Sequence, residues 1–202
     1  IQRMARHWGN LLRALVDSTE RRIGELPMLD ASELQTQVHD WNRTQQAYPT
    51  HTCLQQVSEA QVARTPTAAA LGTGAQSLTY AQLNARANQL AHRLREHGVA
   101  PDVLVGIAVE RSVDMVLGLL AILKAGGAYV PLDPEYPQER LAYMIEDSGI
   151  TLLLTQRALL QALPVAGINV LTLDQDADWL YGYSDSNLSI AHGPQNLSFV
   201  IY

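Results

Sequence analysis

Residues 123–133 decide the fold of this chain, and they read Leu123-Lys124-Ala125-Gly126-Gly127-Ala128-Tyr129-Val130-Pro131-Leu132-Asp133. Gly126 and Gly127 predict the end of a helix, because glycine adopts the left-handed conformation at which many helices stop. The residues that follow predict a strand over 128–132, and Pro131 turns the chain out of the sheet because proline lacks a backbone donor. The stretch therefore predicts a helix that passes directly into a strand, a scaffold on which no catalytic step depends.

On both sides of this stretch, helical patterns alternate with strand patterns. The nearly unbroken apolar run 103–109 predicts a central parallel strand covered on both faces. The segment 113–123 is apolar all round, which predicts a helix sandwiched inside the domain, with Ser112 as its cap. Such alternation is typical of an α/β domain with a parallel sheet. The other elements expected after residue 50 are helices over 54–64 and 137–148 and strands over 67–71, 151–154, 168–173 and 197–202.

A longer helix with a well-specified start is predicted from residue 79. Thr79 can accept a hydrogen bond from the first turn while Gln82 reaches back to the cap, and Leu78 can pack on Leu83. Gly98 suits a left-handed stop at the other end. The buried face of this helix is expected to contain Leu83, Ala87, Leu90, Ala91 and Leu94.

The first fifty residues have a different pattern. Apolar residues at helical spacing, among them Trp8 and Leu12, predict an amphipathic helix over 1–22 that needs a partner surface. The periodicity then fades, with one short helical turn expected near 33–41. The segment 25–50 is too apolar for a flexible tether, so we predict a structured linker. The side chains expected to dock on protein are Leu26, Met28, Leu29, Leu34, Val38 and Trp41.

The composition argues against several classes of function. The chain has a net charge of −6 and no cluster of lysine or arginine, so we expect neither a nucleic acid partner nor a membrane surface. Its longest apolar run, 115–123, is far shorter than the roughly 20 residues that span a bilayer. Cys53 is the only cysteine and no signal peptide opens the chain, so we expect a cytoplasmic protein. The chain begins within a helical pattern and stops on an apolar strand, so we expect a segment of something larger.

Three weaker signals favour structural roles. Lys124 is the only lysine, and in the last turn of a helix its charge complements the helix dipole. His92 and His97 have no cysteine partner that would complete a zinc site, so we expect surface histidines. Residues 72–74 read Gly-Thr-Gly but lack the third glycine of a dinucleotide-binding motif, so we interpret them as a turn.

An acidic stretch near residue 174 resembles a calcium loop only superficially. Asp174, Asp176 and Asp178 alternate as such a loop requires, but Trp179 stands where the loop needs glycine. No glutamate closes it, because the closing position holds Asp185. We therefore predict a solvated acidic loop and no metal.

Several stretches resemble the motifs of one enzyme family. Residues 123–133 resemble the second core motif of the adenylation domains of nonribosomal peptide synthetases almost letter for letter. Residues 78–83 are similar to the first core motif, with Gln82 where the family usually has glutamate. Residues 26–29 and 41–44 resemble the beginning and end of the linker that joins condensation and adenylation domains. The resemblance to the first core motif rests on Leu78, Thr79, Tyr80, Gln82 and Leu83. The resemblance to the linker rests on Leu26, Leu29, Trp41, Asn42 and Thr44.

The resemblance implies a chain that crosses a junction between synthetase domains. It implies the last helix of a condensation domain over 1–24, a linker over 25–50, and the first portion of an adenylation domain over 51–202. The implied fold is α/β, the N-terminal part of the large subdomain of an adenylate-forming enzyme. Residues 196–202 resemble the strand that leads, in the family, into a phosphate-binding loop.

The resemblance also implies the activity of a parent enzyme. That enzyme would activate an amino acid with ATP and magnesium as an aminoacyl-adenylate, load it on the phosphopantetheine of a carrier domain, and condense it into a peptide. In the family the ATP, amino-acid and catalytic residues lie beyond Tyr202, so we expect no catalytic, cofactor-binding or metal-binding residue here. Two alternatives stay open, an acyl-CoA ligase-like adenylate-forming enzyme and a non-catalytic docking fragment. The amino acid and the peptide product also stay open.

Overall fold

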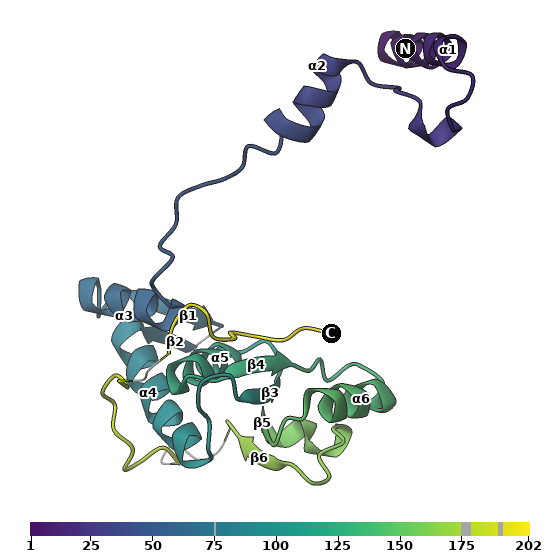
Figure 1. Cartoon of the computed structure of the whole chain (residues 1–202). Helices are drawn as coiled ribbons and strands as arrows, with labels where there is room; N and C mark the ends of the chain where they lie inside the picture. The colour runs from purple at the N-terminus through teal and green to yellow at the C-terminus, as the bar shows by residue number, and fades with distance from the viewer. Residues whose placement is uncertain (75, 175–178, 190–191) are drawn as a thin grey trace. The chain divides into compact units, whose positions relative to one another are not determined.

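The computed structural model describes residues 1–74, 76–174, 179–189 and 192–202. It divides into two compact units, Ile1–Pro49 and Thr50–Tyr202, which we call the N-terminal unit and the C-terminal unit (Figure 1). Among the described residues, no helix combines the length and the apolar content that crossing a bilayer requires.

The N-terminal unit consists of α1 (Gln2–Asp17) followed by shorter helical segments. This helix ends five residues before the predicted end at residue 22, and the residues between Val16 and Ile23 have no apolar side chain that could continue its apolar face. The expected helical turn near residues 33–41 is present and begins earlier than predicted. Asp30 caps it, since its Oδ1 accepts a hydrogen bond from the backbone of Glu33 at 2.8 Å. The other elements are η1 (Ile23–Glu25), α2 (Ala31–Leu34) and the π-helical η2 (Gln35–Asp40).

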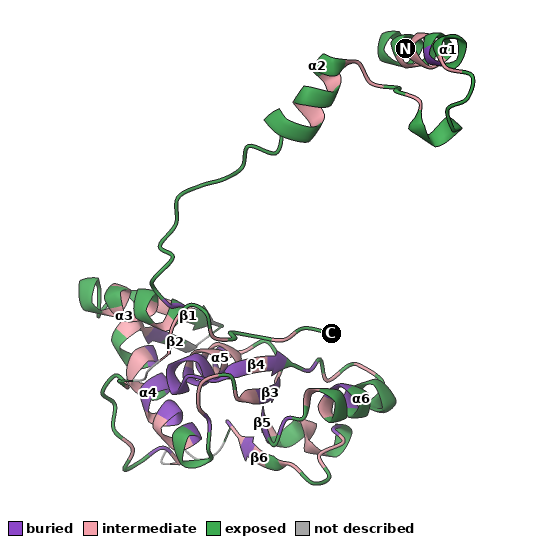
Figure 2. Ribbon diagram, viewed as in Figure 1, coloured by how far each residue is buried: buried purple, intermediate pink, exposed green. Residues whose placement is uncertain are grey.

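The N-terminal unit buries very little of its apolar surface. Ala14 is its only buried residue among those described, and Trp8, on the predicted apolar face of α1, is 65% exposed. Figure 2 shows this unit coloured almost entirely as exposed or intermediate. Polar contacts hold α1 to the following segment instead. Arg6 and His7 bind the two oxygens of Glu33 at 3.0 and 2.9 Å. The apolar face of α1 is thus left without a partner within this unit.

The C-terminal unit is built on a parallel sheet of four strands in the order β4-β3-β5-β6. At its centre Gly106 of β3 lies opposite Val130 of β4 and Leu153 of β5. The sheet confirms the predicted α/β class, because successive parallel strands require crossover connections, which here contain the helices. The strands are β3 (Leu104–Ala108), β4 (Ala128–Pro131), β5 (Leu152–Thr155) and β6 (Asn169–Thr172).

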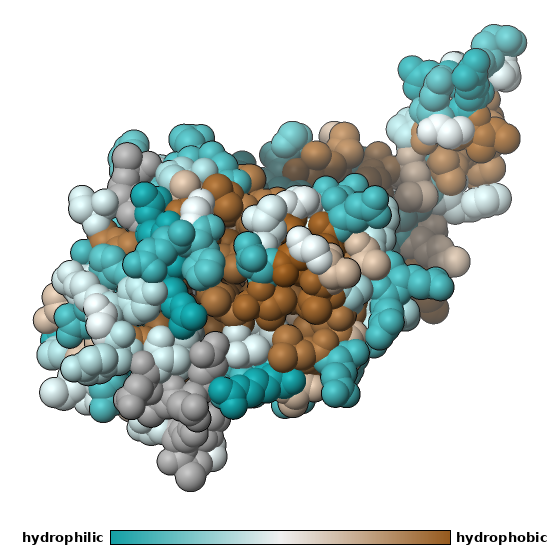
Figure 3. Space-filling model, turned by 90° about the horizontal axis from the view of Figure 1, so that it is seen from below, coloured by the Kyte–Doolittle hydropathy of each residue, from teal (hydrophilic) through white to brown (hydrophobic). Residues whose placement is uncertain are grey.

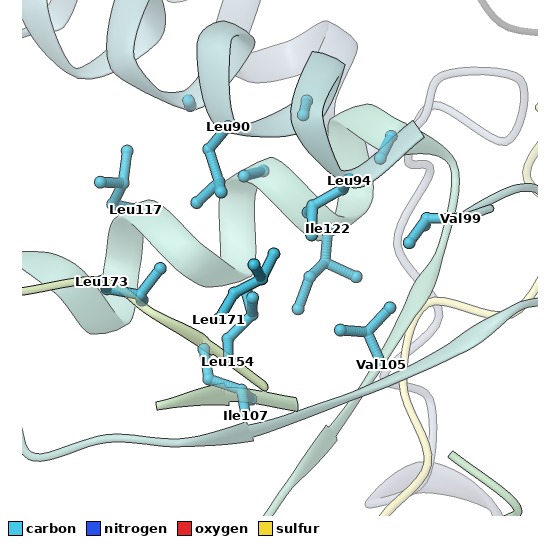
Figure 4. Close-up of a cluster of buried hydrophobic side chains, with 14 of the residues drawn as sticks. Leu90, Leu94, Val99, Val105, Ile107, Leu117, Ile122, Leu154, Leu171 and Leu173 are labelled. Atoms are coloured by element: carbon cyan, nitrogen blue, oxygen red, sulfur yellow. The ribbon is translucent and has the colours of Figure 1, made fainter. Parts of the chain in front are cut away.

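Helices cover both faces of this sheet. On one face α5 (Val113–Ala125) lies between the sheet and α4 (Tyr80–Glu96), and no residue of α5 is exposed, as predicted for a sandwiched helix (Figure 4). On the other face α6 (Gln138–Ser148) packs on the sheet through Leu141 and Met144. The remaining helices are α3 (Leu54–Arg64) and η3 (Arg157–Ala162).

Adjacent residues of the central strands point into different cores. Ile107 and Leu154 belong to the core beneath α5, whereas Ala108 and Leu153 belong to the core beneath α6. Burial on both faces explains why these strands read as continuous apolar runs. Figure 4 shows side chains from α4, α5, β3, β5 and β6 pointing into the first core. The labelled members are Leu90, Leu94, Val99, Val105, Ile107, Leu117, Ile122, Leu154, Leu171 and Leu173.

The start of α4 has the predicted capping box. Thr79 Oγ1 accepts from the backbone of Gln82 at 3.2 Å, and Gln82 Oε1 accepts from the backbone of Thr79 at 2.9 Å. The expected buried face of α4 is confirmed, and Asn88 is buried with it. At the start of α5 the prediction that the Ser112 side chain caps the helix is wrong. Ser112 occupies the cap position, but its hydroxyl donates back to Glu110 O and caps nothing.

Before α4 the structure contains a hairpin that the sequence did not predict. Strands β1 (Ala69–Thr73) and β2 (Gln76–Thr79) pair antiparallel, and Gly74 has a φ of 55° between them. The prediction of one strand over 67–71 closed by a turn at 72–74 is therefore wrong in extent. The polar residues of β2 conceal the strand, since one hairpin partner at a surface needs no apolar run.

Gly126 and Gly127 are each suited to their position for a different structural reason. Gly126 ends α5 with a φ of 91°, as predicted. At Gly127 an added Cβ would come within 2.6 Å of Val99 Cγ1 and 3.1 Å of Val103 O, so a side chain has no room there. Ala128 then donates its backbone N–H to Val103 O at 2.9 Å and starts β4. The helix α5 therefore passes into the strand β4 with only these two glycines between them.

Candidate functional site

The carboxyl ends of β3 and β4 border a cavity of about 810 Å³, which we call the carboxyl-edge cavity. The segments 109–111 and 132–136, which follow the two strands, line it together with Ile201 and Tyr202. In open α/β sheets ligands bind outside the carboxyl ends of the strands. This cavity is therefore the candidate site that the fold itself indicates.

The described lining is largely apolar, with an acidic rim. Arg111 is its one cationic side chain, against the carboxylates of Glu110, Asp133 and Glu135. A nucleotide triphosphate requires cationic side chains, backbone N–H groups and a metal around its phosphates. This lining does not fit a triphosphate, and we derive no step of adenylation from it. Among the described residues no cluster of histidine, cysteine, aspartate or glutamate could hold a metal ion.

The predicted motif residues divide between the cavity and the scaffold. Tyr129, Pro131, Leu132 and Asp133 of the second motif line the cavity. Leu78 and Leu83 of the first motif and Ala125 of the second share the core beneath α5. The structure thus brings the two motifs together through packing, and only the end of the second motif reaches the cavity.

Lys124 lies in a buried polar cluster, away from the described lining of the cavity. Its side chain is 1% exposed and forms an ion pair with Glu59 of α3, while Nζ lies 3.4 Å from Asn187 Oδ1. Burial lowers the pKa of Lys124, and the ion pair with Glu59 opposes that shift. Asn88 donates to the same Asn187 oxygen at 2.9 Å and to Asp185 O at 2.6 Å. Lys124 therefore joins α3, α5 and the loop 179–189, a structural role that the helix dipole alone does not describe.

The predicted docking residues of the linker lie in the N-terminal unit. Trp41 is 66% exposed and Thr44 is also exposed, whereas Leu26 and Leu29 are half-buried. Asn42 has a local role that the sequence did not predict, because its Nδ2 donates to Gln37 O and Val38 O at 2.9 and 3.0 Å and ends η2.

The weaker sequence signals have local contacts in the structure. Both carboxylate oxygens of Asp174 accept from the backbone of Arg157, at 2.9 and 3.0 Å, whereas Asp176 and Asp178 lie outside the described residues. His92 is half-buried, with Nε2 3.3 Å from Ser186 O, and His97 is exposed. Both histidines therefore lie at the surface as predicted, with His92 partly covered by its contact to Ser186.

Residues 197–202 extend beside β4 and pair with it at a single bridge. The predicted strand over 197–202 is present only as a parallel bridge between Tyr129 and Phe199. Sequence reasoning missed the residue that anchors this segment, Asp102, whose carboxylate accepts from Leu197 N at 2.7 Å and from Asn196 Nδ2 at 2.9 Å. No local signal marks a pair so far apart in the sequence.

Comparison with known proteins identifies the family. Residues 58–202 match the family model described as AMP-binding enzyme, and the chain belongs to this family. Tyrocidine synthase 3 of Brevibacillus parabrevis is 46% identical over the whole chain, and gramicidin S synthase 2 of Brevibacillus brevis is 45% identical. The chain spans only 3% of the first of these proteins and 4% of the second.

Solved structures agree with this assignment. The nonribosomal peptide synthetase FmoA3 superposes with a TM-score of 0.77 at 31% identity, covering 100% of this chain and 22% of that one. Its form bound to α-methyl-L-serine-AMP gives 0.75 at 30% identity, covering 96% of this chain and 23% of that one. The predicted family of enzymes and the predicted fold, an N-terminal part of an adenylate-forming domain, are thereby confirmed.

Proposed function

We propose that this chain is part of a modular nonribosomal peptide synthetase that activates an amino acid with ATP as an aminoacyl-adenylate and loads it on a phosphopantetheine carrier domain. One observation carries this proposal. The similarity to peptide synthetases runs through all 202 residues, including the N-terminal unit, which the AMP-binding family model leaves out. A free-standing acyl-CoA ligase is not expected to contain the segment that precedes the AMP-binding domain.

Within this synthetase we assign residues 1–24 to the last helix of a condensation domain, 25–50 to the linker, and 51–202 to the first portion of the adenylation domain. The break between compact units after Pro49 supports the second boundary. The exposed apolar face of α1 supports the first assignment, because such a face is typical of a contact with protein.

In this proposal the chain supplies scaffold and linker for the synthetase and no catalytic group. An amino-acid carboxylate is a poor electrophile, and ATP supplies the leaving group when it forms a mixed anhydride with AMP. The groups that bind ATP, magnesium and the amino acid come, in this proposal, from other parts of the synthetase. Figure 3 shows apolar side chains gathered on one face of the C-terminal unit with polar ones around them, which supports packing against further protein.

Amino-acid-dependent exchange of pyrophosphate into ATP tests the proposal. The purified natural polypeptide is screened with single amino acids in the presence of magnesium. We expect strong exchange with one amino acid or a few related ones. Exchange with a fatty or aromatic acid instead, followed by coenzyme A acylation, would support the acyl-CoA ligase alternative, and no exchange with any acid would support the docking fragment.

A further inference from the structure

Residues 197–202 lie along the edge strand β4, and their backbone pairs with a single residue of that strand. Tyr129 N donates to Ser198 O at 3.1 Å, and Val200 N donates to Tyr129 O at 3.0 Å. The rings of Tyr129 and Phe199 lie 5.6 Å apart. The segment therefore meets the sheet at one point.

Burial gives this segment little preference for one register. Leu197, Phe199 and Ile201 lie on one face of the segment, and all three are exposed among the described residues. On the opposite face Val200 is only partly buried, where it packs against the core beneath α6. Register is specified strongly only where one face of a strand is buried, and a slip by one residue turns every side chain to the other face. One partly buried side chain specifies the register only weakly, so a directed polar contact can decide it.

Asp102 supplies that contact at the start of the segment. It lies in the turn between α4 and β3 with a φ of 66°, which aspartate and asparagine tolerate better than most residues. One carboxylate oxygen accepts from Leu197 N and the other from Asn196 Nδ2. The backbone bond from Leu197, and then the bond from Asn196, hold the pKa of Asp102 below its usual value, so the carboxylate is charged at neutral pH.

The amide of Asn196 has its orientation fixed as well. Its Oδ1 accepts from Gly193 N at 2.9 Å while its Nδ2 donates to Asp102. Turning the amide over would lose both bonds. Asp102 therefore recognises two consecutive residues, a side chain and a backbone N–H, and this pair defines one register.

The far end of the segment reaches the carboxyl-edge cavity. Ile201 and Tyr202 line that cavity, and the Tyr202 hydroxyl donates to Asp147 Oδ2 of α6 at 2.6 Å. A slip of one residue at Leu197 would put Ile201 where Tyr202 stands. One extended segment thus connects the Asp102 contact at the amino edge of the sheet with the side chain of Tyr202 at the carboxyl edge.

We propose that Asp102 is a positioning residue, which fixes the register of residues 197–202 and through it the placement of Tyr202 at the carboxyl-edge cavity. The catalytic consequence rests on the proposed function, since ligands of open α/β sheets bind at the carboxyl edge. The structural consequence, a fixed register, does not depend on it.

Exchanging the donor and acceptor between two residues tests the proposal in the full synthetase. Asp102→Asn places an amide nitrogen against one of its two donors, so one hydrogen bond is lost whichever way the amide turns. In the double variant Asp102→Asn/Asn196→Asp, the new amide at position 102 accepts from Leu197 N through its oxygen and donates through its nitrogen to the new carboxylate. The second oxygen of that carboxylate still accepts from Gly193 N, and the double variant has the same net charge as the natural protein. Asp174→Asn is the matched control, because Asp174 also accepts backbone bonds with both oxygens, in a different loop.

Two measurements are made on each variant, hydrogen–deuterium exchange of the peptide covering residues 193–202 and kcat/KM for pyrophosphate exchange. We expect Asp102→Asn to speed deuterium uptake in this peptide and to lower kcat/KM about tenfold, as loss of one charge-assisted hydrogen bond predicts. The double variant should restore both to within about twofold, and Asp174→Asn should change neither.

A double variant as defective as Asp102→Asn would overturn the proposal, as would a single variant with natural deuterium uptake. An equal loss in Asp174→Asn would do the same, since the effect would then be general. If the natural polypeptide shows no pyrophosphate exchange, the proposed function fails, and deuterium uptake alone still decides whether Asp102 fixes the register.

Discussion

The two units of this chain use the same helical pattern in opposite ways. In the C-terminal unit the apolar face of α4 is covered, and Leu90 and Leu94 are fully buried against α5 and the sheet. In the N-terminal unit the equivalent face of α1 leaves Trp8 and Leu12 exposed. Apolar periodicity therefore predicts that the apolar face of a helix packs against other protein. It does not predict whether that protein belongs to the same segment of the chain.

The largest expected difference comes from deleting one side chain in each unit. Leu90→Ala should lower the free energy of unfolding by about 4 kcal/mol, because it removes a fully buried side chain and leaves a cavity in the core. Trp8→Ala should change it by less than about 0.5 kcal/mol, since Trp8 is exposed. Denaturant unfolding measures both variants in the same polypeptide. Equal losses would show that α1 has a core of its own.

The next largest effect concerns the buried charge of Lys124. Glu59→Gln should cost about 2 kcal/mol at neutral pH, below the loss for a fully buried pair because the Glu59 side chain is 23% exposed. Without Glu59 the pKa of Lys124 falls further below its usual 10.5, so the unfolded state binds more protons and stability rises with pH up to that value. The defect should therefore shrink as pH rises.

Unfolding measured at neutral pH and near pH 10 checks this dependence, with Glu146→Gln on the exposed side of α6 as the control. A defect of Glu59→Gln that stays constant over this range would contradict a charged, buried Lys124. Such a pH dependence is expected only for the C-terminal unit, because no buried charged residue occurs among the described residues of the N-terminal unit.

A smaller effect separates two helix starts within the C-terminal unit. Thr79→Ala should cost about 1 kcal/mol, because it removes a capping hydroxyl from α4. Ser112→Ala should be almost neutral, because the Ser112 hydroxyl caps nothing on α5. Thermal unfolding of the two variants gives the difference, and a larger loss for Ser112→Ala would contradict the capping assignments.

The smallest effect on stability is expected in the linker. Trp41→Asp should leave the free energy of unfolding of the C-terminal unit unchanged within about 0.5 kcal/mol, because Trp41 is exposed and lies in the other unit. In the full synthetase it should weaken docking between the condensation and adenylation domains, which limited proteolysis of the linker detects, with the pyrophosphate exchange rate unaltered. A lost exchange rate with unchanged proteolysis would contradict the docking role.

Local signals in the sequence predicted local structure well. The capping box at Thr79 and the helix stop at Gly126 depend on residues within one turn, and both are present. The strand predicted directly after Gly127 is present as β4. The parallel sheet followed from apolar runs that only burial on two faces explains.

Contacts between distant residues could not be predicted in this way. Lys124 meets Glu59 and Asp102 meets Leu197 only because the fold brings separate loops and helices together. The hairpin β1–β2 was missed because polar surface strands have no distinctive pattern. These long-range polar contacts are where the structure adds most to the sequence.

One measurement tests most directly whether this chain is scaffold. Amino-acid-dependent pyrophosphate exchange is compared between residues 1–202 alone and the complete natural polypeptide, at equal molar concentration. The account predicts exchange by the complete polypeptide and none by residues 1–202, because the described lining of the carboxyl-edge cavity does not suit the phosphates of ATP. Exchange by residues 1–202 alone would contradict it, and would place the catalytic groups within the chain itself.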